Sequence, residues 1–109
     1  MNIHFLDPAP ENNHPILLLH GLGTDSRSWG YQFSALASSG FRPIAVDLPG
    51  FGRSAPLQGR WNIPTVADHM ASWLSGSGYG SIPVVGISMG GTVALQLAIS
   101  HPEVVSSLI

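Results

Sequence analysis

Short apolar runs alternate along the chain with longer segments in which apolar residues recur at helical spacing. The runs cover residues 3–6, 16–19, 44–46, 82–85 and 104–109, and their length and composition predict β-strands. The second run is continuously apolar, as expected for a strand that is buried on both faces of a sheet. Strands that alternate with helices predict βαβ units. The pattern therefore predicts an α/β fold with a partial, mainly parallel sheet and flanking helices.

Three helices are predicted between these strands. Asp25 or Ser26 can cap the first helix, and Gly40 ends it in a left-handed conformation. Asn62 can cap the second, which the glycines at 76, 78 and 80 are expected to break. The apolar stripes of these two helices are Trp29, Phe33, Leu36 and Ala37, and Val66, Met70, Trp73 and Leu74.

The third predicted helix, residues 89–100, is apolar nearly all round, so we expect it to lie in an interior. His101-Pro102 ends it, and the strand over 104–109 follows. Only 9% of the residues are charged, well below the roughly 25% of an average soluble protein. An apolar strand left at the edge of a sheet on such a surface predicts self-association through that edge.

Composition narrows the range of functions. The 109 residues allow one small domain, and 44% of them are hydrophobic, which is enough for a core. A formal net charge of −2 argues against nucleic acid and against an anionic membrane as partners. The absence of cysteine excludes disulfides and thiolate metal sites, and the five histidines show no ligand spacing, so we expect no metal and no cofactor. Without a secretory signal or a long apolar segment, the expected location is the cytoplasm.

The candidate chemistry lies in Gly86-Ile87-Ser88-Met89-Gly90, which matches the pattern G-x-S-x-G. Because the chain is rich in glycine and serine, the match gains its weight from its position between a predicted buried strand and a predicted helix. That strand–turn–helix setting is required for a nucleophile elbow. The turn is sharp enough to need small residues at Gly86 and Gly90, and it would present the Ser88 hydroxyl at a helix N-terminus, where N–H groups face developing negative charge.

A second hydrogen-bond donor for the same oxyanion is expected in His20-Gly21-Leu22-Gly23, which follows the strand over 16–19. Leu22 N–H is the candidate, with Met89 N–H as its partner. The His20 side chain is expected to hydrogen-bond the backbone rather than to act as a base.

Together, residues 20–23, 47–54 (Asp-Leu-Pro-Gly-Phe-Gly-Arg-Ser) and 86–91 resemble the three signature segments of the α/β-hydrolase superfamily, in the order and approximate spacing of that family. The resemblance covers residues 3–109. It implies a serine hydrolase that acts on a small acyl substrate, namely an ester, lactone, thioester or related carbon–carbon bond. It also implies that the Ser88 strand lies beside the His20 strand, with the ligand in the crevice where the strand order reverses.

A dinucleotide-binding interpretation is weaker. Residues 50–55 fit G-x-G-x-x-A, but Ala55-Pro56 follows where a helix should continue.

The other two members of a catalytic triad are not found. In the resembled family the order along the chain is serine, acid, histidine, and only His101 and Glu103 are ionisable after Ser88. About twelve helical residues put His101 roughly 18 Å from Ser88, so it is interpreted as a helix stop. Upstream, Asp25 is expected to cap a helix, Asp47 to close a strand into a turn, and His69 to lie on the polar side of a helix.

We therefore interpret residues 1–109 as the N-terminal part of a single α/β-hydrolase domain, without its acid and histidine, and expect the isolated chain to be inactive. The alternative is a truncated, non-catalytic homologue that binds a partner or a ligand.

Overall fold

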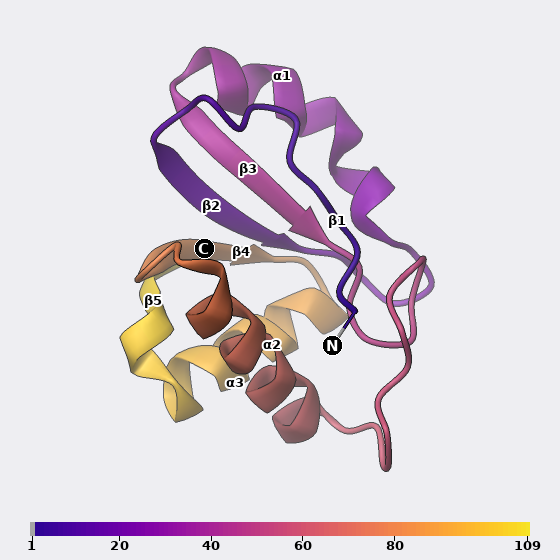
Figure 1. Ribbon diagram of the computed structural model, residues 1–109. Coiled ribbons are helices and arrows are strands. Elements are labelled where there is room, and N and C mark those ends of the chain that lie inside the picture. The colour runs from indigo at the N-terminus through magenta and orange to yellow at the C-terminus, as the bar shows by residue number, and fades with distance from the viewer. Residues whose placement is uncertain (1) are drawn as a thin grey trace.

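One five-stranded sheet organises the computed structural model, which describes residues 2–109. Its elements, drawn in Figure 1, are β1 (Phe5–Leu6), β2 (His14–Leu19), η1 (Ser26–Trp29), α1 (Gly30–Ser38), β3 (Phe41–Val46), α2 (Ile63–Ser77), β4 (Ile82–Gly86), α3 (Met89–Ser100), η2 (Pro102–Val104) and β5 (Val105–Leu108). All five predicted strands are present. The first is shorter than predicted, and the last begins one residue later because Val104 closes the short helix η2.

The strand order is β1-β3-β2-β4-β5, and every pair is parallel except β1 with β3. The predicted α/β class and mainly parallel sheet are confirmed. From β2 the chain proceeds to β3 on one side, then crosses over to β4 on the other. The sheet therefore reverses its direction of winding at β2 and β4, the position where open α/β sheets bind ligands at the carboxyl ends of their strands.

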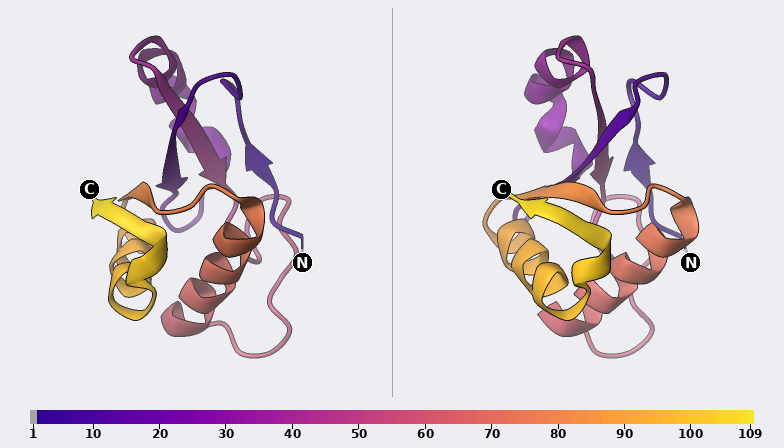
Figure 2. Two further views of the ribbon diagram at one scale, coloured as in Figure 1. Left: turned by 60° about the vertical axis from the view of Figure 1, so that its left-hand side comes forward. Right: turned by 90° about the vertical axis from the view of Figure 1, so that its left-hand side faces the viewer.

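Helices cover both faces of the sheet unequally, with α1 on one face and α2 and α3 on the other (Figure 2). The alternation of side chains along β2 matches this layering. Leu17 and Leu19 belong to the larger core beneath α2 and α3, whereas Ile16 and Leu18 face α1. All four of these residues are buried, which confirms the prediction of a strand buried on both faces.

The helix boundaries agree with the predicted caps, with one correction. Asn62 accepts a hydrogen bond from Thr65 N–H at 2.8 Å and caps α2, and Gly40 follows α1 with φ 90°. The prediction that Gly76 breaks α2 was wrong, because the helix continues to Ser77 and ends at Gly78, where φ is 81°. A helical glycine costs only about 1 kcal/mol, which the packing of α2 against the core offsets.

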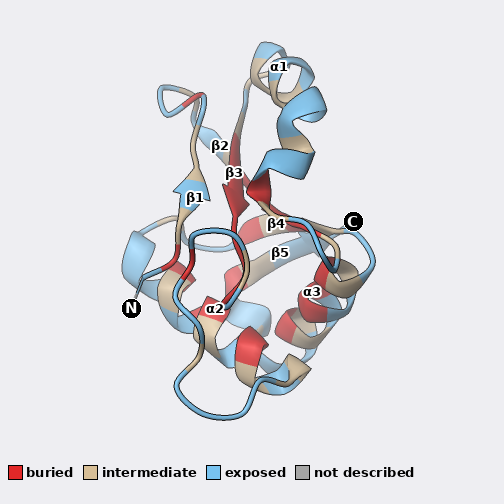
Figure 3. Ribbon diagram, turned by 90° about the vertical axis from the view of Figure 1, so that its right-hand side faces the viewer, coloured by how far each residue is buried: buried red, intermediate tan, exposed pale blue. Residues whose placement is uncertain are grey.

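The expectation that α3 is an interior helix holds for one side only. Val93, Ala94 and Leu97 are buried, whereas Leu95 and Ile99 are 52% and 68% exposed. Figure 3 shows the same division, with exposed segments along α3 and on β5 at the sheet edge. In the part of the chain that the structure describes, no helix has both the length and the hydropathy to cross a membrane.

Candidate active site

Ser88 lies at the turn between the end of β4 and the start of α3. Its backbone has φ 55° and ψ −119°, and it is the one non-glycine residue among 2–109 with a positive φ. A backbone in such a sparsely populated region costs of order 1–3 kcal/mol. The structure therefore contains the sharp strand–turn–helix geometry that the sequence predicts around Ser88.

Two glycines make this turn sterically accessible. A Cβ atom on Gly86 would collide with the backbone of Gly90 and Gly91, on the first turn of α3. A Cβ atom on Gly90 would collide with the carbonyl groups of Leu19 and His20, at the end of β2. These atoms are backbone and cannot rotate away, so both positions require glycine. The close approach at Gly90 also sets the start of α3 directly against β2.

The loop after β2 passes beside the turn. A Cβ atom on Gly21 would be 3.6 Å from both Ser88 Cβ and Ile87 O, which is ordinary van der Waals contact. Leu22 and Ser88 line one hollow of about 390 Å³. The remaining lining residues are Gly21, Thr24, Ser28, Trp29, Gln32 and Ile87. None of the lining residues carries a charge.

Of the predicted oxyanion donors, Leu22 therefore lies at the hollow of Ser88. Met89 is the first residue of α3, and its N–H group is among those that have no partner within a helix. The Met89 side chain packs against the larger core instead of lining the hollow. The structure thus brings Ser88, Leu22, Met89, Gly86 and Gly90 together at the carboxyl ends of β2 and β4.

His20 is fully buried and bonds to backbone groups at both ring nitrogens. Its Nε2 accepts a hydrogen bond from Leu48 N–H at 3.0 Å, and its Nδ1 lies 2.8 Å from the carbonyl oxygen of Gly21. A neutral imidazole has one donor and one acceptor nitrogen. Because Leu48 N–H can only donate, Nε2 is unprotonated and Nδ1–H donates to Gly21. The expectation that His20 bonds the backbone is confirmed.

A profile of the alpha/beta hydrolase fold family matches residues 14–109. The match includes β2, the loop beside it and the complete turn around Ser88. The chain belongs to the alpha/beta hydrolase fold family.

Individual members of this family are longer than the chain. It is 44% identical over 96 residues to a pimeloyl-[acyl-carrier protein] methyl ester esterase of Aeromonas hydrophila, covering 86% of this chain and 35% of the relative. It is 33% identical over 111 residues to epoxide hydrolase 3 of Xenopus tropicalis, covering 100% of this chain and 30% of that protein. The chain thus spans about one third of the length of these curated relatives.

Solved structures lead to the same family. A thermophilic esterase from Thermogutta terrifontis superposes with a TM-score of 0.86 at 34% identity, over 97% of this chain and 38% of the esterase. A putative non-heme bromoperoxidase from Mycobacterium tuberculosis superposes with a TM-score of 0.88 at 28% identity, over 99% of this chain and 40% of the bromoperoxidase.

The structure adds one residue of this region whose role the sequence did not indicate. Asp47 was expected only to close a strand into a turn, but it is 2% exposed and accepts hydrogen bonds from Ser26 N–H at 2.7 Å and Arg53 N–H at 2.9 Å. Burial raises the pKa of the Asp47 carboxyl, but the hydrogen bonds from Arg53 and Ser26 outweigh it and hold the pKa below its ordinary value. Asp47 is therefore a charged anchor for the loops at this edge.

No histidine or carboxylate among residues 2–109 hydrogen-bonds the Ser88 side chain. His101 ends α3, as predicted, and its N–H donates to Leu97 O at 2.8 Å. Its Nε2 lies 2.7 Å from Asp68 Oδ1, and its Nδ1 lies 3.6 Å from Glu103 Oε2. The fold brings α2 beside the end of α3, so His101 lies close to two carboxylates although the spacing along the sequence does not indicate it. Within the described residues, no three or more histidine, cysteine, aspartate or glutamate side chains are grouped so that they could hold a metal ion.

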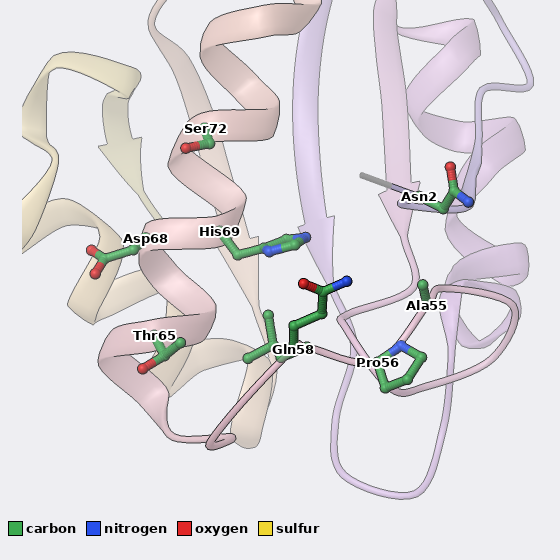
Figure 4. Close-up of a pocket in the computed structure, with 9 residues that line it drawn as sticks. Asn2, Ala55, Pro56, Gln58, Thr65, Asp68, His69 and Ser72 are labelled. Atoms are coloured by element: carbon green, nitrogen blue, oxygen red, sulfur yellow. The ribbon is translucent and has the colours of Figure 1, made fainter.

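A larger hollow of about 660 Å³ lies away from this site and shares no lining residue with it. Figure 4 shows the His69 imidazole directed from α2 toward the loop that carries Pro56 and Gln58, whereas Asp68 points to the other side of the helix. Burial lowers the pKa of His69. The sharp turn found at Ser88 has no counterpart here, so the hollow beside Ser88 remains the candidate active site.

Proposed function

We propose that this chain provides the nucleophile of a serine hydrolase, and that Ser88 Oγ is the attacking atom. The observation that carries the proposal is the left-handed backbone of Ser88, between a buried parallel strand and a helix. Strain of this kind persists where the surrounding structure holds it in place, and it concentrates at active sites. The backbone collisions that a side chain would cause at Gly86 and Gly90 supply that constraint.

The N–H groups of Leu22 and Met89 are the proposed oxyanion hole. The loop that carries Leu22 reaches the hollow of Ser88, and Met89 begins α3. A helix N-terminus carries about half a positive charge, which stabilises an oxyanion. In the proposed step, Ser88 Oγ bonds to the carbonyl carbon, the electrons of the C=O bond move to oxygen, and the serine proton passes to a base.

The proposed substrates are uncharged esters, lactones or related acyl compounds. The hollow beside Ser88 combines the apolar side chains of Leu22, Trp29 and Ile87 with the polar groups of Thr24, Ser28 and Gln32, and it has no charged lining residue. The serine at position 88 favours acyl transfer among the chemistries named for the relatives, which include both an esterase and an epoxide hydrolase.

We further propose that the acid and the histidine come from outside residues 2–109 and that the protein works in the cytoplasm. The support for the first point is that the chain covers about one third of its hydrolase relatives and places no base at Ser88. In a well-studied protease, loss of triad members lowers turnover about a million-fold, yet the oxyanion hole and binding retain about 10³–10⁴ over water. That residual belongs to the oxyanion hole and to binding rather than to the serine, so this chain alone is expected to show no turnover and at most a slow, single acylation of Ser88.

Release of p-nitrophenolate from p-nitrophenyl acetate tests the proposal. The purified chain should release at most a single equivalent of p-nitrophenolate, by slow acylation of Ser88 without turnover, and Ser88→Ala should abolish this release. Ser38→Ala, on an exposed serine at the end of α1, is the matched control and should react as the unmodified chain does. Equal rates for the unmodified chain and Ser88→Ala would instead favour the second candidate, a non-catalytic relative that binds a partner or ligand, which the missing base at Ser88 also favours.

A further inference from the structure

The carbonyl oxygen of Gly21 receives three hydrogen bonds within one short loop. His20 Nδ1 lies 2.8 Å from it and, in the tautomer assigned above, donates to it. Thr24 Oγ1 donates to it at 2.8 Å, and Thr24 N–H donates to it at 3.3 Å. A carbonyl oxygen has two lone pairs, so its hydrogen-bonding capacity is fully used. The orientation of this one carbonyl group is therefore defined from two sides.

A fixed carbonyl also fixes the next N–H group. The peptide between Gly21 and Leu22 is planar and trans, as none of the described peptide bonds is cis, so its C=O and N–H bonds point in opposite directions. With the Gly21 oxygen held toward His20 and Thr24, the Leu22 N–H points away from them. It donates to no acceptor among residues 2–109.

The His20 side of this arrangement is itself held in place. The His20 ring is fully buried, stacks edge-on against Phe51 with ring centroids 5.5 Å apart, and accepts the hydrogen bond of Leu48 N–H. Leu48 follows Asp47, whose carboxylate is anchored by Ser26 and Arg53. The orientation of the Gly21 carbonyl is thus coupled to the end of β3 as well as to its own loop.

We infer that His20 and Thr24 are positioning residues, which hold the Gly21–Leu22 peptide so that the Leu22 N–H is presented to an oxyanion formed at Ser88. The inference rests on the proposed function for its catalytic meaning, and it goes beyond that proposal by assigning a role to two side chains that do not touch the reacting atoms. A Cβ atom placed on Gly21 would lie 3.6 Å from Ser88 Cβ, so this peptide lies beside Ser88 and its rotation bears directly on the site.

Thr24→Val is the sharpest variant, because Thr24 is exposed and the substitution removes only the hydroxyl donor. His20→Asn keeps an N–H donor near the position of Nδ1 but loses the acceptor for Leu48 N–H. It therefore tests whether a donor alone is enough to hold part of the orientation of the Gly21 carbonyl. Thr65→Val is the matched control, because Thr65 lies on α2 away from Ser88. Thermal unfolding followed by circular dichroism establishes that each variant is folded.

The first readout is the heteronuclear ¹H–¹⁵N NOE of the Leu22 amide, with ¹⁵N shifts of the His20 ring to establish the tautomer. We expect an Nδ1–H tautomer, a rigid Leu22 amide in the unmodified chain and Thr65→Val, and a lowered NOE at Leu22 in Thr24→Val. An unchanged Leu22 NOE in Thr24→Val, or an Nε2–H tautomer of His20, would overturn the inference. This result does not depend on any reaction at Ser88.

The second readout compares acylation of Ser88 by an ester and by its thionoester, in which sulfur replaces the carbonyl oxygen. Sulfur is a weak hydrogen-bond acceptor, so an oxyanion donor favours the oxygen ester. Thr24→Val should lower the ester-to-thionoester rate ratio about tenfold, less than the roughly 10²–10³ lost when an entire donor is removed. An equal fall of both rates would show a general structural effect and contradict positioning, whereas failure of Ser88→Ala to change either rate would contradict the proposed function itself.

Discussion

The carboxylate of Asp47 accepts a hydrogen bond from the backbone N–H of Ser26 at 2.7 Å, although the two residues are 21 positions apart. The contact joins the end of β3 to the start of η1. Both segments border the loop that carries Gly21 and Leu22, so an ionised carboxylate beneath the proposed oxyanion loop helps to define its shape.

Replacement of Asp47 by Asn should destabilise the fold. The amide would turn an N–H group toward donors, leaving Ser26 N–H or Arg53 N–H without an acceptor, and an unsatisfied buried group costs about 1–3 kcal/mol. Urea unfolding measures the loss. Glu11→Gln removes an exposed carboxylate and should leave the midpoint in place; equal midpoints for Asp47→Asn and the unmodified chain would refute the role of Asp47.

The fold should also lose stability in acid. The pKa of Asp25 is lowered from 3.8 to about 2, chiefly by its side-chain hydrogen bond with Arg27, and the pKa of Asp47 is lowered as well. A carboxyl with a lower pKa in the folded state stabilises it above the unfolded pKa, and this contribution disappears as pH falls through the folded pKa. The free energy of unfolding should therefore decrease as the pH is lowered from 3.8 to about 2.

Urea unfolding at a series of pH values measures this dependence. Asp47→Asn and Asp25→Asn should each flatten it. A stability that stays constant or rises over the same interval would contradict the assigned directions.

Two glycine substitutions should have opposite effects on stability, one at the turn around Ser88 and the other inside α2. Gly90→Ala should destabilise the chain by about 1–3 kcal/mol or more, because the new methyl group meets the carbonyls of Leu19 and His20. Gly76→Ala should stabilise it by up to about 1 kcal/mol, because that position is helical and open. Thermal unfolding compares the two; a Gly90→Ala protein as stable as Gly76→Ala would show that the turn tolerates a side chain.

We also predict self-association through the edge formed by β5 and the outer side of α3, where Leu95, Ile99, Leu108 and Ile109 are 43–69% exposed. Ile99→Glu should raise the monomeric fraction in size-exclusion chromatography with light scattering, because it places a charge on the apolar surface. Tyr31→Glu is the control, since Tyr31 is 96% exposed but lies on α1. A chain that is fully monomeric at all concentrations would contradict the prediction.

The features that could be predicted from the sequence are those set by residues close to one another along the chain. Gly86, Ser88 and Gly90 lie within five positions, and the small size of the two glycines permits the sharp turn. The cap at Asn62 and the alternation of β2 are local in the same sense. The class and the layering of the fold follow from these patterns.

Contacts between distant segments could not be predicted in this way. Nothing near Asp47 indicates that Ser26 will approach it, and His101 meets Asp68 only because α2 packs beside α3. The apolar composition of α3 did not indicate that Leu95 and Ile99 would face outward, because periodicity is lost when nearly every position is apolar. Gly76 was misjudged because a single glycine costs less than continued packing contributes.

The proposed role of Ser88 as the nucleophile can be examined by mapping the residue that a serine-directed reagent modifies. The intact chain is incubated with a fluorophosphonate, digested, and mapped by tandem mass spectrometry alongside Ser88→Ala and Ser38→Ala. We expect one adduct, on Ser88, formed more slowly than in a complete hydrolase, unchanged in Ser38→Ala and absent from Ser88→Ala. Labelling spread over several exposed serines, or equal labelling of Ser88→Ala, would contradict it.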